Sequence, residues 1–227
     1  MQAEPSGHDR PHIMHYAFSE TEQAFQVELR RFAAKKLAPH YQSDDEAGVM
    51  RPTLLSDMAS VGLTGLRIPE EFGGQQATSV VAGLAAEEVG RADFNATYVI
   101  INTCLVADIM VRHADHDRQA VWLPPIAAGQ VVPALLLTEP DHGSDAAAME
   151  CRAIRDGDGW VITGEKTSIT FGLVAPMGLV MARTGGAGAR GVSAFYVPLD
   201  HPAVTRSGFD DLGGRSIGRA SMFFDGL

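Results

Sequence analysis

LLLTEPDHGSD, residues 135–145, is where the chain changes from helical patterning to strands. Its leucines predict a short apolar strand, and Pro140 and Gly143 predict a loop after that strand. Such a loop presents hydroxyls and free backbone N–H groups, and its glycine lets a ligand approach the backbone closely. Further along, GEKTSIT at 164–170 adds a predicted turn and more hydroxyls on a strand. Together the two stretches predict a site for a flat, polar heteroaromatic cofactor, with ordinary turns of a β-domain as the alternative.

Before residue 131, apolar residues recur at helical spacing. Ser19–Glu22 fits a capping box, and a helix is predicted from there to Pro39. Asp93 is expected to cap a later helix. Residues 1–14 are expected to form a disordered leader, because they are polar and contain prolines and a glycine. Further helices are predicted at Thr53–Val61, Ser79–Val89, Phe94–Ala114 and His116–Ala128, with a loop at Gly62–Gly74.

After residue 131, short apolar and β-branched runs alternate with turn residues, as in a small antiparallel sandwich or barrel. The whole chain is therefore an α+β protein, in which a helical domain at 15–131 follows the leader and precedes a β-domain at 132–227. The predicted strands are Val132–Leu137, Trp160–Thr163, Ser168–Phe171, Leu179–Thr184, Val192–Val197 and Ser221–Phe224.

The composition is that of an ordinary globular protein, with 227 residues, 45% of them hydrophobic and 20% charged. The net charge of −10 disfavours nucleic acid, although a local cluster of donors still allows an anionic small molecule. The 2 cysteines suggest neither a disulfide framework nor a metal site. No continuous apolar run approaches the ~20 residues of a membrane span, so we expect no membrane insertion and a cytoplasmic protein.

Two sequence motifs lack the surrounding elements that their usual functions require. Gly186–Gly191 spells G-x-G-x-x-G, but that dinucleotide fingerprint requires a helix after it, and Val192–Val197 is a predicted strand. A hairpin loop is therefore the better interpretation. Asp156–Gly159 has the start of a calcium loop but lacks the later ligands and the closing glutamate, so it predicts a turn.

Two further groups of polar residues also predict no chemistry of their own. His113 and His116 could share a helix face, but no third metal ligand is identifiable, so a solvated face is expected and no metal site is predicted. His142–Asp145 contains the residue types of a hydrolytic triad, yet adjacent loop residues cannot form a relay, and no nucleophile elbow is present.

Several blocks in the correct order resemble the acyl-CoA dehydrogenase family. The resemblance implies a helical N-terminal domain, a middle β-domain, and FAD at their junction. The matching blocks are Ala17–Glu20, Leu37–Pro39, Val61–Gly74, Leu123–Gly129, Leu137–Asp145, Gly164–Lys166 with Ile169-Thr170, and Phe223–Asp225.

The resemblance also implies roles for individual residues. Thr138 would hydrogen-bond the pyrimidine side of the isoalloxazine ring, Thr170 would donate toward flavin N5, and Ser144 would also lie beside the pantetheine. Neutral donors suit a ring that gains negative charge as hydride arrives. The implied flavin-side residues are Leu135, Leu137, Thr138, Gly143, Ser144, Ser168 and Thr170, and the implied substrate-side residues are Ser144, Tyr98, Asn102 and Leu105.

The implied reaction is α,β-dehydrogenation of an acyl-CoA thioester, with electrons passing to an electron-transfer flavoprotein. Ser168 stands where the family usually has a tryptophan, which leaves that side roomier and more polar. The sequence ends at Leu227, before the family's C-terminal helical bundle with its catalytic glutamate, so no catalytic base is assigned. We expect a homo- or hetero-oligomer that needs a C-terminal domain or a partner chain and that alone binds FAD poorly and is inactive. A non-catalytic partner subunit and a related acyl-CoA oxidase or flavin monooxygenase are the alternatives.

Overall fold

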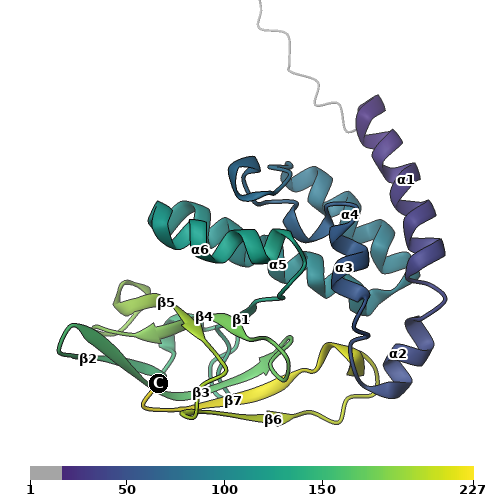
Figure 1. The fold of residues 1–227 in the computed structure, drawn as a ribbon. Helices are drawn as coiled ribbons and strands as arrows, with labels where there is room; N and C mark the ends of the chain where they lie inside the picture. The colour runs from purple at the N-terminus through teal and green to yellow at the C-terminus, as the bar shows by residue number, and fades with distance from the viewer. Residues whose placement is uncertain (1–16) are drawn as a thin grey trace, which may run out of the picture.

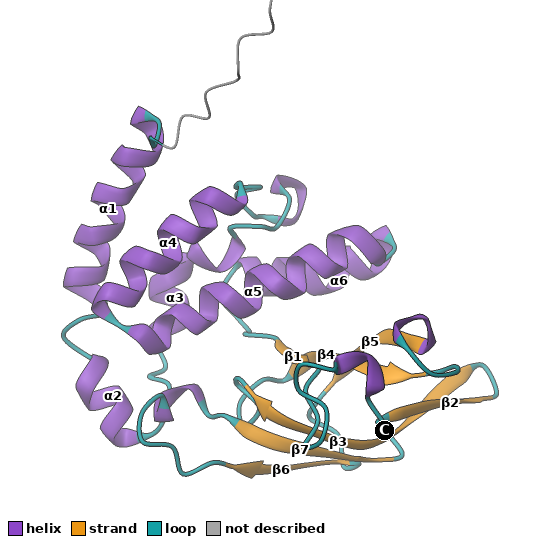
Figure 2. Ribbon diagram, turned by 180° about the vertical axis from the view of Figure 1, so that it is seen from behind, coloured by secondary structure: helices purple, strands orange, loops and turns teal. Residues whose placement is uncertain are grey.

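A computed structural model describes residues 17–227, which form a layer of helices above a curled β-sheet (Figure 1). The predicted leader at 1–14 lies outside the described residues. Figure 2 shows the same two layers from behind, with α1 and α2 at one end. The helices are α1 (Glu20–Lys36), α2 (Tyr41–Ala47), α3 (Leu54–Ala59), α4 (Ser79–Ala92), α5 (Phe94–His113) and α6 (His116–Ala127), and short 3₁₀ turns occur at Leu63–Gly65, Glu70–Phe72, Ala146–Ala148, Ala189–Gly191 and Arg215–Ile217.

The capping box predicted for the first helix is confirmed. Ser19 Oγ accepts from the backbone N–H of Glu22 at 3.3 Å, and the Glu22 carboxylate accepts from the backbone N–H of Ser19 at 2.7 Å. Further along α1, Arg30 donates to the buried carboxylate of Glu88 on α4 at 2.7 Å. Helix α1 is thus defined by its own sequence and attached to the domain by buried Leu29 and Ala33 and by ion pairs, which include Lys36 with Asp57.

Helix α5 is the central element of the helical layer. Its predicted cap is confirmed, because Asp93 Oδ1 accepts from the backbone N–H of Ala96 at 3.0 Å. By length and composition alone α5 could cross a membrane, but 56% of its most apolar window is buried inside the protein, as in the core helix of a soluble protein. Val99, Ile100 and Met110 are among its buried residues.

The sheet is mixed, which corrects the predicted antiparallel arrangement. Strand order is β1-β4-β2-β3-β7-β6, with β5 paired to β4. The pairs β1–β4 and β2–β4 are parallel, whereas the others are antiparallel. The strands are β1 (Ala134–Leu136), β2 (Arg152–Asp156), β3 (Gly159–Ile169), β4 (Met177–Arg183), β5 (Val192–Pro198), β6 (Val204–Gly208) and β7 (Ala220–Asp225).

The turn predicted at Gly164–Lys166 is wrong, because these residues lie inside β3. That strand continues to Ile169, so Ser168–Phe171 is not a separate strand. Gly164 has φ 142°, and a Cβ built there would lie 2.8 Å from Cys151 Cα. The glycine permits two segments to pack closely and does not reverse the chain.

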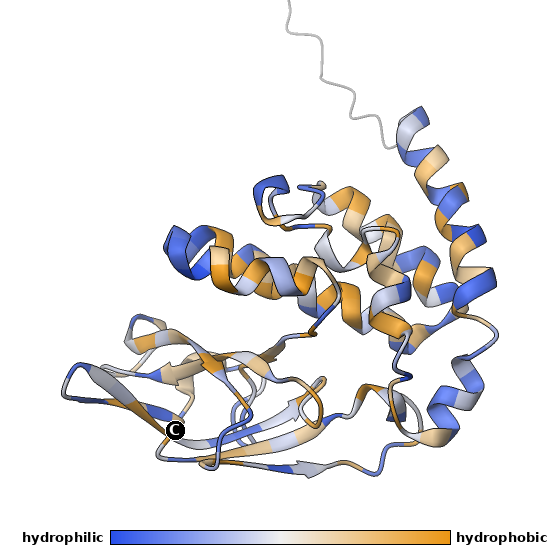
Figure 3. Cartoon of the chain, viewed as in Figure 1, coloured by the Kyte–Doolittle hydropathy of each residue, from blue (hydrophilic) through white to orange (hydrophobic). Residues whose placement is uncertain are grey.

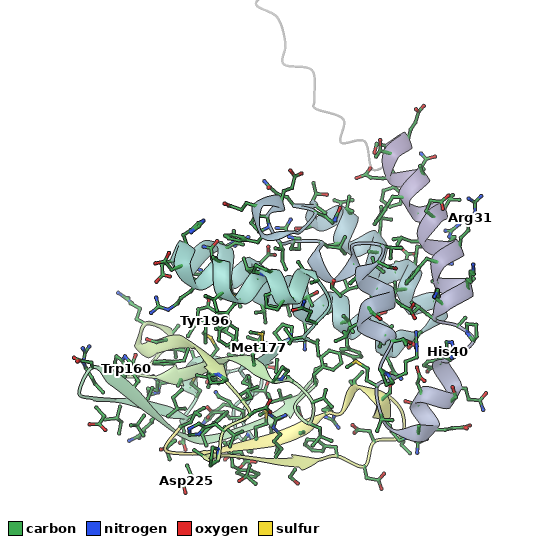
Figure 4. The ribbon with its side chains drawn as sticks, viewed as in Figure 1. Arg31, His40, Trp160, Met177, Tyr196 and Asp225 are labelled. Carbon is green, nitrogen blue, oxygen red and sulfur yellow. The ribbon has the colours of Figure 1, made fainter. Side chains whose placement is uncertain are left out.

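The helical layer and the sheet meet through an apolar junction. Leu135, Met177 and Tyr196 pack against a buried cluster that includes Met110 of α5 and Leu123 of α6. Figure 4 shows Met177 and Tyr196 on the side of the sheet that faces the helices, and Figure 3 shows apolar residues on α5 and α6 above it. The loop after β1 therefore leaves the sheet at the boundary between the layers.

Replacing the cap of α5 tests its local stability. We expect Asp93→Ala to lower the free energy of unfolding by about 1–2 kcal/mol, because an orphan N–H loses its acceptor. Asp93→Asn keeps an acceptor and should cost less. Burial raises the pKa of Asp93 above its ordinary value, although hydrogen bonds from the Ala96 and Asn95 amides oppose this shift. Because the folded protein therefore holds the proton more tightly than the unfolded chain, the contribution of Asp93 to the free energy of unfolding should fall as pH rises through its raised pKa. Urea unfolding at several pH values measures both effects; equal losses in the two variants would contradict the capping role.

Candidate functional site

A buried ion pair joins the two stretches from which the cofactor site was predicted. Lys166 Nζ donates to Glu139 Oε1 at 2.7 Å and to the backbone carbonyl of Leu137 at 2.9 Å. The Lys166 side chain is 0% exposed and that of Glu139 is 5% exposed. The pair therefore clamps the loop after β1 onto the C-terminal part of β3.

Backbone donors complete the surroundings of the carboxylate. The N–H groups of Glu150 and Cys151 donate to Glu139 at 2.6 and 2.9 Å. Burial by itself raises the pKa of Glu139, but these amides and Lys166 outweigh it and hold the pKa below its ordinary value. Glu139 is thus an ionised structural anchor. The neighbouring Cys151 thiol has its pKa raised by burial to about 11, so it remains protonated near neutral pH.

The clamp brings Thr138 beside the end of β3. The backbone N–H of Thr167 donates to the carbonyl of Thr138 at 2.9 Å. Thr138 and Thr170 are both half-buried. Two of the predicted flavin-side residues therefore belong to adjacent segments.

The end of β3 has an unusual backbone. Ser168 and Phe171 have φ of 58° and 60°, values that non-glycine residues adopt at a cost, and the register with β7 shifts between Lys166 and Ile169. Arg219 Nη1 donates to Ser168 Oγ at 3.3 Å, and the N–H of Phe171 donates to the carbonyl of Ile217 at 3.1 Å. The connection between β6 and β7 supports this strained bulge from one side.

The other predicted flavin-side residues take different positions. Leu135 packs at the junction with the helices, whereas Leu137 contributes its carbonyl to Lys166. Gly143 and Ser144 lie on the exposed loop. The next residue, Asp145, borders a cavity of about 500 Å³ that is also lined by Arg183 and by the glycine-rich loop 185–188. The hydrogen bonds of residues 17–227 do not join Gly143 or Ser144 to Thr170, so their place in the site remains a prediction.

Among the predicted substrate-side residues, Tyr98 and Leu105 lie on a partly exposed face of α5. Leu105 is 45% exposed, and the same face carries the exposed Phe94 and Ile101, which were not predicted as substrate-side residues. Asn102 borders this face but is buried, and its amide donates to the carbonyl of Pro133 at 3.4 Å. Asn102 therefore attaches α5 to the segment that enters β1.

The arrangement can hold the flat, uncharged ring of a cofactor. Thr138, Ser168 and Thr170 carry hydroxyls, belong to neighbouring segments and are not fully buried, while the charges of Glu139 and Lys166 are buried and compensate each other. These donors suit FAD, whose ring needs neutral hydrogen bonds. In the part of the chain that the structure describes, no group of three or more His, Cys, Asp and Glu side chains could hold a metal ion.

Sequence reasoning missed three of the residues that build the site, namely Glu139, Lys166 and Arg219. The sequence did contain a signal for Lys166. It lies four residues after Ile162 on β3, so the two side chains share one face of the strand, and Ile162 places that face toward the core. The positions of Glu139 and Arg219 depend on partners distant in the sequence, and neither had a local signal.

Both domains match family models. The N-terminal domain of acyl-CoA dehydrogenases matches residues 19–130, and the middle domain matches residues 134–227. Probable acyl-CoA dehydrogenase YngJ of Bacillus subtilis (strain 168) is 32% identical over 217 residues, covering 93% of this chain and 57% of that protein. (2S)-methylsuccinyl-CoA dehydrogenase of Cereibacter sphaeroides is 31% identical over 214 residues, covering 88% of this chain and 39% of that protein.

Solved structures also match the fold of this chain. A glutaryl-CoA dehydrogenase from Mycobacterium smegmatis in complex with FADH2 matches with a TM-score of 0.85 and 26% identity, covering 92% of this chain and 54% of that one. The chain thus spans about half the length of the relatives it matches.

Breaking the buried pair tests its role as the anchor of the site. Glu139→Gln or Lys166→Met alone should lower the free energy of unfolding by about 3–5 kcal/mol, because each leaves a buried charge without its partner. The double variant should lose less than the sum of the single losses. Chemical denaturation of the four proteins measures this coupling, and simple additivity would contradict it.

The lowered pKa of Glu139 gives a pH signature. Its stabilising contribution is complete above about pH 4.3, the ordinary value for a glutamate, and is lost as pH falls through the lower pKa of the folded state. Glu139→Gln should therefore flatten the acid side of the stability profile. An unchanged slope between about pH 2 and 5 would argue against an ionised Glu139.

The strain at Ser168 is measurable by comparing two substitutions. Ser168→Ala removes the hydroxyl but keeps the Cβ at positive φ, whereas Ser168→Gly removes both. We expect the glycine variant to be more stable than the alanine variant by about 1 kcal/mol. Thermal unfolding measures the difference, and a more stable alanine variant would show that the bulge is unstrained.

Proposed function

Because this chain belongs to the acyl-CoA dehydrogenase family, we propose that it supplies the N-terminal and middle domains for FAD-dependent α,β-dehydrogenation of an acyl-CoA thioester. The observation that carries the proposal is the clamp between Glu139 and Lys166, which sets Thr138 beside the end of β3. The clamp explains how hydroxyl-bearing residues from two distant stretches come to lie in adjacent segments.

Bound FAD would supply a flavin ring that accepts the β hydrogen of the substrate as hydride. Thr138 would donate to the pyrimidine side of that ring, and Thr170 would donate near N5. Both donors are neutral; the carbonyl of Thr138 accepts from the N–H of Thr167, and Phe171, next to Thr170, donates its N–H to the carbonyl of Ile217. Such donors stabilise developing negative charge without reorganising. Leu137 and Gly143 would supply apolar and unobstructed contacts to the ring.

The partly exposed face of α5 would form the wall of the acyl pocket. Tyr98 and Leu105 present apolar surface there, and Ser144 would contact the pantetheine on the opposite side. Large apolar side chains exposed on one face of a core helix are typical of a surface that another group covers. The acyl chain of the substrate is one such group.

The catalytic base would come from outside these residues. Asp93 is occupied as a helix cap and Glu139 is paired to Lys166, so neither carboxylate is free to take a proton. We propose that the base and the second wall of the flavin site come from sequence corresponding to the remaining half of the relatives, either in the same polypeptide or in a partner subunit. The electrons would then pass to an electron-transfer flavoprotein.

Flavin titration tests the function. The purified 227-residue chain should bind FAD weakly and show no turnover with acyl-CoA, and both should rise strongly when the remaining half is supplied. In that complete form, Thr138→Val should weaken FAD binding about 3–10-fold, the effect of one lost hydrogen bond. Thr205→Val, an exposed residue on β6, is the matched control.

Flavin absorbance and fluorescence measure binding, and reduction of a dye acceptor measures turnover. Tight FAD binding with turnover by the chain alone would contradict the need for a second half. Flavin binding without any turnover in the complete form would favour a non-catalytic partner subunit, and rapid reaction of the reduced flavin with oxygen would favour an oxidase or monooxygenase.

A further inference from the structure

A cavity of about 500 Å³ opens between the start of α5 and the connection from β6 to β7. It is separate from the glycine-rich loop cavity and combines residues from both layers. Its lining is Tyr41, Phe94, Asn95, Tyr98, Asp211, Gly213, Gly214, Ile217 and Arg219.

The cavity adjoins both sides of the proposed active site. Tyr98 belongs to the face of α5 that would wall the acyl pocket. Arg219 donates to Ser168 Oγ at 3.3 Å, and the carbonyl of Ile217 accepts from the N–H of Phe171 at 3.1 Å. The segment 168–171, which would lie beside the flavin, therefore borders the cavity through two of its lining residues.

Aromatic rings dominate the walls. Phe94 and Tyr98 form an edge-to-face pair with centroids 5.4 Å apart and an interplanar angle of 82°. Phe94 is 57% exposed and Tyr41 is 41% exposed, so both rings have free surface. Opposite α5, Gly213 and Gly214 carry no side chain that would narrow the space.

The charges in the cavity are compensated. Arg219 Nε donates to Asp211 Oδ2 at 3.0 Å, and Arg219 Nη2 also donates to Asp211. The other lining residues are neutral. A second carboxylate would meet Asp211 without an unpaired cation, so an acyl group with a terminal carboxylate is disfavoured. One face of the Arg219 guanidinium lies over Phe209, with Cζ 4.3 Å from the ring centroid, which leaves the opposite face for a ligand.

We propose that this cavity receives the far end of the acyl group and selects thioesters whose acyl group carries an uncharged ring, aromatic or alicyclic. This inference rests on the proposed function, because it takes the face of α5 as the acyl wall. A ring packs edge-to-face against Phe94 and Tyr98 and against the guanidinium plane of Arg219. A straight chain would bury less against these flat walls.

Fragments that lack CoA test the cavity independently of FAD. The 227-residue chain is titrated with 3-phenylpropanamide, hexanamide and glutaramate while its aromatic and isoleucine side-chain NMR signals are followed. We expect 3-phenylpropanamide to shift the signals of Phe94, Tyr98 and Ile217 and to bind at least about fivefold tighter than hexanamide, which is a difference of about 1 kcal/mol. Glutaramate should bind weakest.

Substitutions assign the binding to these walls. Phe94→Leu keeps an apolar side chain but removes the ring, and Arg219→Gln removes the guanidinium plane; each should reduce binding of 3-phenylpropanamide at least threefold. Phe18→Ala is the matched control, because Phe18 is 40% exposed just before α1 and is not among the residues that line the cavity. Circular dichroism checks that each variant is folded.

The outcomes separate this inference from the proposed function. Equal or tighter binding of hexanamide, tighter binding of glutaramate, or no shift at the cavity would each overturn it. So would full binding in folded Phe94→Leu and Arg219→Gln variants. Failure of the complete form to bind FAD would instead overturn the proposed function, even if the ring fragment binds as expected.

Discussion

The ion pair between Glu139 and Lys166 is the constraint on which the site depends. Taking two charges out of water costs several kcal/mol each, and that cost is offset only when every donor and acceptor finds a partner. Glu139 has two backbone N–H groups besides Lys166, and Lys166 has the carbonyl of Leu137 and the sulfur of Met149. Three chain segments must hold their positions for the pair to remain satisfied. Its burial therefore makes the geometry of the loop after β1 cooperative with that of β3.

The same arrangement explains why the accessible donors are neutral. A free lysine beside a flavin would change the electrostatics of the ring, but Lys166 is fully buried and compensated. At this end of the sheet, the half-buried Thr138 and Thr170 and the exposed Ser168 carry neutral hydroxyls. The strained backbone at Ser168 aims its hydroxyl at Arg219, whose own charge is compensated by Asp211. The charged pairs Glu139–Lys166 and Asp211–Arg219 thus hold the backbone in place, while the neutral hydroxyl residues carry the proposed contacts to the ligand.

The helices were predictable because their signals are local. The capping box at Ser19 and the cap at Asp93 each lie within three residues of the N–H that they satisfy, and the sequence shows both. Helix α2 was missed because it has no buried residue, and β2 and β6 were missed because they contain few apolar residues. Strand pairing depends on residues that are distant in the sequence, so the parallel pairing of β1 with β4 could not be predicted from the sequence of either strand.

The features of the site that were predictable were likewise the local ones. The sequence showed the hydroxyls and glycines of both stretches, and the family resemblance implied their roles. It did not show that Glu139 and Lys166 pair, since 27 residues separate them. Gly164 was misinterpreted for the same reason, because a turn is the usual local reason for a glycine, whereas here the reason is the approach of Cys151.

The exposed apolar face of helix α5 is longer than the cavity at its start. Its partly exposed face runs from Phe94 to Leu105, about 16 Å at a rise of ~1.5 Å per residue. The cavity reaches only the first part of this face, at Phe94 and Tyr98, so Ile101 at 40% exposure and Leu105 at 45% lie beyond its lining. An acyl group seated at the start of the helix leaves the later residues uncovered unless the chain runs along the whole face. Under the proposed function, the acyl group would cover the start of this face, and a second protein surface would cover whatever part of Ile101 and Leu105 the acyl chain does not reach.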